Sequence, residues 1–89
     1  MEVLYKRRFL KQLAKLPRHV RIEIEKFVFE ELPNSENIAS AGKIEKLKGY
    51  SGFYKVRFGS YRVGLRAGDN GSISVEIVMH RSQIYQAFP

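Results

Sequence analysis

The dipeptide Gly59-Ser60 separates two stretches in which apolar and polar residues alternate, 53–58 and 61–67. Alternation with a period of two predicts β-strands. A two-residue loop with glycine in its first central position favours a type II′ hairpin turn. Such a turn fixes which residues of the two strands face each other, so Phe58 is expected opposite Tyr61. One short turn therefore sets the register of the whole hairpin.

The rest of the chain completes an α+β pattern. A third alternating stretch, 73–79, follows a second glycine-rich turn. Residues 1–5 are short and apolar, and apolar residues then recur at helical spacing on both sides of Pro17. We therefore predict one domain over residues 1–89 with the order strand, helix, helix and three meandering antiparallel strands. The two helices would cover one face of an antiparallel sheet, with a loop at 34–42 and a short helical turn at the C-terminal end.

Strand alternation divides the strand residues between two faces of this sheet. The face expected to lie under the helices consists of Tyr54, Val56, Phe58, Tyr61, Val63, Leu65, Ile73, Val75, Ile77 and Met79. The opposite face is expected to carry Lys55, Arg57, Arg62, Arg66, Glu76 and His80. The sequence therefore predicts one apolar face and one strongly basic face.

The hairpin register places Arg57 opposite Arg62 and Lys55 opposite Gly64, where we expect open surface. Two arginines directly across a strand pair repel each other. An anion between them would turn that repulsion into charge-assisted hydrogen bonds, so we interpret the pair as a phosphate site. Two alternatives stay open. The arginines could extend into solvent, or Glu76 could neutralise Arg62 across the neighbouring strand.

Composition narrows the classes of function. The formal net charge of +7 favours a polyanionic partner, although a soluble domain that is merely basic is the alternative. The chain has no cysteine, which removes disulfides, thiolate nucleophiles and cysteine-ligated zinc, and His19 and His80 alone make no plausible metal site. No apolar run approaches the roughly 20 residues of a membrane span, and no signal peptide is recognisable. We therefore expect a cytoplasmic protein without membrane contact.

Two segments resemble the RelE/ParE superfamily of type II toxin–antitoxin modules. They are LKGYSGFYKVRFGSYRV at 47–63 and MHRSQIY at 79–85. The resemblance covers essentially the whole chain, because the inferred order of elements is that of the superfamily. It implies a toxin, and the basic residues resemble the RelE branch, whose members cleave mRNA in the ribosomal A site. The implied partners are a RelB-like antitoxin, mRNA and the ribosome, and no cofactor is implied.

The candidate site residues follow from the resemblance and from the basic face. The resemblance implies that the active positions are Lys55, Arg57, Arg62, Arg81 and Tyr85, and the other basic positions add His80 as a catalytic candidate and Lys48 and Arg66 as RNA contacts. RelE-type members can carry lysine where this chain has Arg57, and arginine is a poor proton acceptor. The general base for the 2′-hydroxyl is therefore His80, or Lys55 among cations that favour its neutral amine. Arg57 and Arg62 would hold the phosphate, Arg81 would lie at the leaving oxygen, and Tyr85 would stack on or orient a base.

Two other classes of function remain possible on the sequence alone. One is a ParE-like inhibitor of DNA gyrase that does not cut RNA, and the other is a nucleic-acid-binding module without catalysis.

An antitoxin contact is suggested by Ile22 and Phe29, seven residues apart on the second predicted helix. They lie roughly opposite the apolar stripe that contains Val20 and Ile24. An exposed stripe would be an apolar patch for a partner helix. If the helix is instead sandwiched, both stripes are buried.

Overall fold

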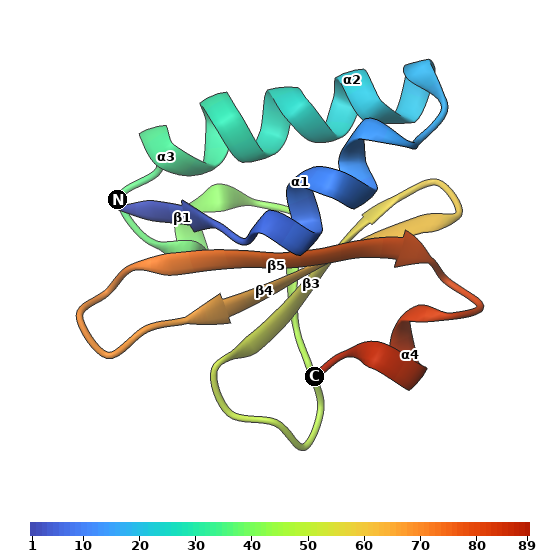
Figure 1. Cartoon of the computed structure of the whole chain (residues 1–89). Coiled ribbons are helices and arrows are strands. Elements are labelled where there is room, and N and C mark those ends of the chain that lie inside the picture. The colour runs from blue at the N-terminus through green and yellow to red at the C-terminus, as the bar shows by residue number, and fades with distance from the viewer.

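The computed structural model describes all 89 residues and has an α+β fold, as predicted. Its sheet has five strands in the order β1–β5–β4–β3–β2, and the longer helices lie over one face of it (Figure 1). The strands are β1 (Val3–Tyr5), β2 (Ile44–Lys46), β3 (Phe53–Phe58), β4 (Tyr61–Ala67) and β5 (Ile73–His80). The helical elements are α1 (Arg7–Ala14), α2 (Arg18–Lys26), the π-helical η1 (Phe27–Glu31), α3 (Leu32–Asn34), the 3-10 turn η2 (Ile38–Ala41) and α4 (Ile84–Ala87).

The second helical segment is longer than one regular helix. Pro17 precedes α2, and the chain continues without a break through η1 into α3 (Figure 1). Ile24 is buried on α2, and the consecutive residues Phe27 and Val28 are both buried in η1. A π-helical turn widens the helix by one residue, which explains how two adjacent side chains both reach the core. None of the helices is both long and apolar enough to cross a membrane.

The predicted hairpin is confirmed in its register. Phe58 lies opposite Tyr61, Arg57 lies opposite Arg62, and Lys55 lies opposite Gly64. Gly59 has a φ of +59°, as a first central position of a type II′ turn requires. The turn chemistry was therefore sufficient to align the strands.

Two features of the sheet differ from the prediction. β1 pairs with β5 in parallel, so the sheet is mixed rather than purely antiparallel. The helical segment between β1 and the other strands makes this possible, because parallel neighbours need a long crossover connection. The second difference is β2, which pairs with β3 beyond the expected loop. Its three residues are too short to show a period in the sequence.

A β-bulge changes the parity of β5. Leu65 of β4 lies opposite Val75, but its neighbour Gly64 lies opposite Ile77, which leaves Glu76 without a cross-strand partner. The extra residue inverts the alternation beyond the bulge. The prediction of a regular strand was therefore wrong for three residues: Ile77 and Met79 face away from the helices, and His80 faces toward them.

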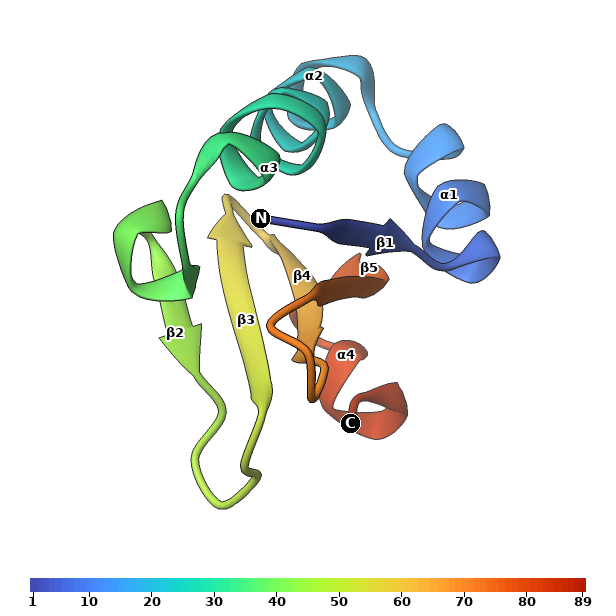
Figure 2. The same cartoon turned by 90° about the vertical axis from the view of Figure 1, so that its left-hand side faces the viewer.

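The bulge gives the molecule a hydrophobic cluster on each face of the sheet. The cluster under the helices contains 14 buried residues, including Phe9, Ile24 and Leu65. The second cluster has only four: Leu47, Ile77, Ile84 and Phe88. It fixes the C-terminal segment with α4 against the face opposite the long helices (Figure 2). We call that side the open face.

Candidate active site on the open face

The C-terminal segment brings Tyr85 to Lys55. Ile84 is buried in the open-face cluster, which anchors α4, while the adjacent Tyr85 ring is 59% exposed. Lys55 Nζ donates a hydrogen bond of 2.8 Å to Tyr85 Oη and lies 5.3 Å from the centre of its ring. Two residues that are 30 positions apart in the sequence thus form one cation–aromatic pair. This pair is the most specific contact among the expected site residues.

The opposed arginines are both present, but each has a protein partner. Arg57 Nε lies 3.1 Å from Glu45 Oε1 of β2, a residue that the sequence did not single out. Arg62 Nη1 donates to the carbonyl oxygens of Gly59 at 2.8 Å and Tyr61 at 2.9 Å. The expected repulsion is therefore relieved by neighbouring acceptors. Arg62 Nε and Nη2 make no hydrogen bond within the protein and remain available to an anion.

Glu76 does not neutralise Arg62. Met79 is the residue opposite Arg62, because the bulge shifts the register of β5. The Glu76 carboxylate instead accepts a hydrogen bond from the hydroxyl of Ser74 on its own strand. The cross-strand ion pair considered from the sequence is therefore not formed.

Arg81 lies at the same end of the sheet as Arg62. Its backbone N–H donates to the carbonyl of Ser60 at 2.8 Å, which ties the chain after β5 to the hairpin turn. The Arg81 side chain is exposed. Because Arg62 bonds the carbonyl of Gly59 in this turn, the turn positions two cations at once.

His80 is separated from the other candidates by the sheet. It lies opposite Tyr61, with ring centroids 5.6 Å apart, and Tyr61 packs on the helix-side cluster. Its Nδ1 lies 2.8 Å from Ser82 Oγ. The expectation that His80 shares the basic face is therefore wrong, and the cause is again the bulge in β5.

The surface beside Lys55 is not open at Gly64, contrary to expectation. Gly64 is buried, and a Cβ there would meet Ile77 Cγ2 at 2.7 Å and Phe88 Cε2 at 2.8 Å. The C-terminal segment thus covers the place where we expected substrate to approach. The four-residue spacing of the apolar residues Ile84 and Phe88 was the sequence signal for this packing.

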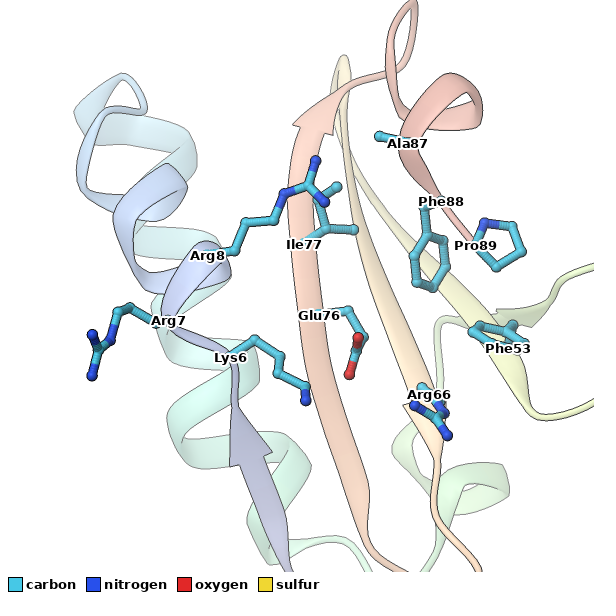
Figure 3. Close-up of a pocket in the computed structure, with 10 residues that line it drawn as sticks. All are labelled: Lys6, Arg7, Arg8, Phe53, Arg66, Glu76, Ile77, Ala87, Phe88 and Pro89. Carbon is cyan, nitrogen blue, oxygen red and sulfur yellow. The ribbon is translucent and has the colours of Figure 1, made fainter.

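Lys55 instead lines one of two neighbouring clefts on the open face. The first, here named the tyrosine cleft, has a volume of about 420 Å³ and is lined by Leu47, Lys48, Tyr50, Lys55, Tyr85, Phe88 and Pro89. It contains the predicted Lys48 and, in addition, the exposed ring of Tyr50, which the sequence reasoning missed. Arg66 lies in the second cleft, which Phe88 and Pro89 also line (Figure 3).

The second helical segment leaves one apolar stripe uncovered. Ile22 is 48% exposed and Phe29 is 42% exposed, whereas Val20 and Ile24 are buried against the sheet. The ring centroid of Phe29 lies 4.9 Å from that of Tyr5. The sandwiched arrangement, in which both stripes are buried, is thus wrong.

Comparison with known proteins adds a family to this geometry. Residues 3–85 match the family described as "ParE toxin of type II toxin-antitoxin system, parDE". The chain is 38% identical over 90 residues to Toxin RelE3 of Methanocaldococcus jannaschii, with complete coverage of both proteins.

Solved structures of RelE toxins share the fold. The RelB-RelE antitoxin-toxin complex from Methanococcus jannaschii contains a chain that matches with a TM-score of 0.77 and 31% identity, covering 97% of this chain and 99% of that one. The isolated RelE toxin of E. coli matches with a TM-score of 0.68 and 27% identity, covering 96% of this chain and 90% of that one. The resemblance stated from the sequence is thus confirmed.

Proposed function

The chain belongs to the ParE toxin family of type II toxin–antitoxin systems, and we propose that this toxin is an endoribonuclease that cuts messenger RNA. The observation that carries the proposal is the contact of Lys55 with Tyr85 on the face where Arg57 and Arg62 lie opposite each other. RNA brings its own nucleophile, the 2′-hydroxyl. A protein that cuts it must remove that proton, hold the phosphorane charge and protonate the leaving oxygen.

Lys55 is the better candidate for the base, because His80 lies on the other side of the sheet. A lysine amine accepts a proton only in its neutral form. The 2′-oxygen then attacks the adjacent phosphorus, and the bond from phosphorus to the 5′-oxygen breaks. The products are a 2′,3′-cyclic phosphate and a 5′-hydroxyl end.

The arginines divide the remaining work. Arg62 is held in place by two carbonyl oxygens, so its free Nε and Nη2 donors are oriented before RNA arrives. Arg57 would release Glu45 to bind the phosphate, which costs little because exposed ion pairs are weak. We assign Arg81 to stabilisation of the negative charge on the 5′-oxygen, which takes its proton from water, and Tyr85 to stacking on a base. No step calls for a metal ion.

The openness of the site supports a ribosomal substrate. The side chain of Arg57 is 64% exposed, so the phosphate position between the two arginines lies on open surface that does not itself align a flexible RNA strand. In-line attack needs such alignment, and holding the reacting groups in place lowers the barrier substantially. We propose that the ribosome supplies it by presenting mRNA in the A site.

The test compares Lys55→Met with Lys55→Arg on programmed ribosomes and on free mRNA. Both variants lose the base, so we expect both to lower single-turnover cutting by at least about 100-fold. Because Lys55→Arg keeps the positive charge, its loss of activity would be due to proton transfer rather than to charge. His80→Gln serves as the matched control and should retain both the rate and its pH profile. Chelation of divalent ions that leaves ribosome integrity intact should not change the rate.

Three results would count against this function. Full activity of Lys55→Met would show that Lys55 is not the general base. Loss of a neutral-pH inflection in the rate of His80→Gln would assign that role to His80. An unaltered RNA pool combined with inhibited DNA gyrase would identify the chain as a non-cutting toxin. Mapping RNA ends and measuring supercoiling in the same cells separates the two classes.

We further propose that a RelB-like antitoxin is the partner of this toxin and covers the Ile22–Phe29 stripe. The support is that the stripe is apolar and exposed and that the chain as a whole is highly basic. These two properties suit an amphipathic partner helix with acidic residues. Phe29→Asp should weaken antitoxin binding while RNA cutting persists, and Glu30→Asp is a control at an exposed neighbouring position. Loss of folded protein, or unchanged affinity, would contradict this placement.

A further inference from the structure

The second cleft on the open face, here named the arginine cleft, plays no part in the cutting chemistry derived above. It has a volume of about 380 Å³ and is lined by the cations Lys6, Arg7, Arg8 and Arg66, by Glu76, and by apolar residues that include Phe88. The cations come from opposite sides, since Lys6 precedes α1, Arg7 and Arg8 begin it, and Arg66 belongs to β4 (Figure 3). The cleft is therefore assembled by the fold and is not a run of neighbouring residues.

The charges of this cleft are not satisfied within the protein. The ion pair of Arg57 with Glu45 is the only salt bridge in the structure, so none of the four cations has a carboxylate within 4 Å. Glu76 is held by the Ser74 hydroxyl, although Figure 3 shows Lys6 directed toward it. The arrangement also has a cost, because cations at the start of a helix oppose its dipole. The local balance of charge thus favours a polyanion.

The position of the cleft indicates which polyanion it binds. Phe88 and Pro89 line both the arginine cleft and the tyrosine cleft, so the two clefts share one wall. A strand whose phosphate is held near Lys55 would pass over this wall and reach Arg66. The partly exposed ring of Phe53 offers apolar surface to a base in the arginine cleft, and it packs edge to face on the buried Phe88, with ring centroids 5.6 Å apart.

We propose that the arginine cleft binds the phosphates of the RNA strand that flanks the cleavage point, with Arg8 and Arg66 as its principal contacts. The inference rests on the proposed function for the identity of the strand. The cleft extends the grip on RNA beyond the cutting residues, and its cations act by charge rather than by reading sequence. Figure 3 shows Arg8 directed over Ile77, whereas Arg7 points away from the cleft.

The test measures how RNA affinity depends on salt. The probe is a fluorescent oligouridylate of about 12 nucleotides, methylated at each 2′-oxygen so that it cannot be cut. For single strands, each phosphate that the protein neutralises adds about 0.7 to the steepness of log affinity against log salt. The double variant Arg8→Ala, Arg66→Ala leaves two phosphates without a cation, so it should make the slope shallower by about 1.4.

The matched control is Lys11→Ala, Lys26→Ala, which removes the same charge from helix positions outside both clefts. We expect it to change the slope by less than half as much. An equal change of slope in both double variants would mean that net charge alone sets RNA affinity, and would overturn the proposal that the arginine cleft binds RNA. A slope unchanged by removal of Arg8 and Arg66, with weakened antitoxin binding instead, would make the cleft an antitoxin contact and would also overturn it.

This result is independent of catalysis, because the probe is never cut. A shallower slope would uphold the cleft even if wild-type protein failed to cut mRNA, and that failure would count only against the nuclease. Both substituted side chains are exposed, so the fold should persist, as thermal melting would show. The double variant Arg8→Gln, Arg66→Gln removes the same charges but keeps longer, polar side chains than alanine. It should give the same slope as the alanine double variant.

Discussion

The two faces of the sheet use alternate residues of the same strands, yet they are built on different scales. The helix-covered face buries 14 residues in one continuous cluster and contains none of the catalytic candidates except the displaced His80. The open face buries four residues and surrounds them with Lys55, Arg57, Arg62 and Arg66. Burial stabilises the first face, whereas the second remains charged and accessible.

Stability and activity are therefore separable in this protein, with one physical link between them. The open-face cluster is small, but it holds α4 and hence the Tyr85 ring beside Lys55. Substitutions in the large cluster should change how much protein is folded. Substitutions in the small cluster should change what the folded protein does.

The largest expected effect comes from making the same substitution in both clusters. Ile24→Ala removes a fully buried side chain under the helices and should lower the free energy of unfolding by about 2–5 kcal/mol. Ile84→Ala should cost less, because a terminal segment can relax around the cavity, but it should reduce RNA cutting by freeing Tyr85. Urea unfolding and single-turnover cutting measure the two effects. If both variants lowered only stability, the proposed division between the faces would fail.

A smaller effect is expected where the open-face cluster touches the sheet. Gly64→Ala would place a Cβ 2.7 Å from Ile77 Cγ2 and 2.8 Å from the Phe88 ring. Overpacking of this kind costs about 1–3 kcal/mol, and displacement of Phe88 should also lower cutting. Gly71→Ala is the control for a glycine with open space around it, although its φ of +82° adds some backbone strain. Unchanged cutting by Gly64→Ala would show that Phe88 does not position the site.

An alkaline pH should weaken the helix-covered face. The Tyr5 hydroxyl donates to the carbonyl of Val28, and burial raises the pKa of Tyr5 above its ordinary value of 10.0. The folded state therefore holds this proton more tightly than the unfolded state. Its contribution is complete below about pH 10 and is lost as the pH rises through the raised pKa.

Tyr5→Phe tests this expectation. It should cost about 1 kcal/mol near neutral pH, the usual worth of one hydrogen bond. It should also flatten the alkaline part of the curve of unfolding free energy against pH. An identical alkaline decline in both proteins would assign the effect to other groups.

The smallest effect is expected on the open face, at the ion pair of Arg57 with Glu45. Both side chains are largely exposed, so Glu45→Gln should change stability by about 0.2–1 kcal/mol. It should also lower the KM for RNA, because Arg57 no longer has to exchange a carboxylate for a phosphate. Measurement of KM at two salt concentrations separates this release from general attraction. A raised KM would mean that Glu45 positions Arg57 for binding.

The sequence by itself determined the α+β class, the two faces of the central hairpin and the pairing of Arg57 with Arg62. These follow from local chemistry, because a two-residue turn and a period of two fix register without reference to the rest of the chain. The resemblance of residues 47–63 to a toxin family depended equally on local sequence. Helical spacing alone also placed Ile22 and Phe29 on a stripe opposite Val20 and Ile24, whereas the exposure of that stripe was decided by the tertiary structure.

Only the tertiary structure decided where His80, Ile77 and Glu45 lie. The bulge in β5 depends on how β4 and the C-terminal segment pack together, so no pattern within β5 reveals it. The three residues of β2 become a strand only by pairing with β3, and this pairing brings Glu45 to Arg57. The contact of Lys55 with Tyr85 likewise depends on burial of Ile84 and Phe88 on the open face. Long-range packing thus placed Tyr85 beside the base candidate Lys55, because burying apolar surface fixed the C-terminal segment where strand alternation alone could not.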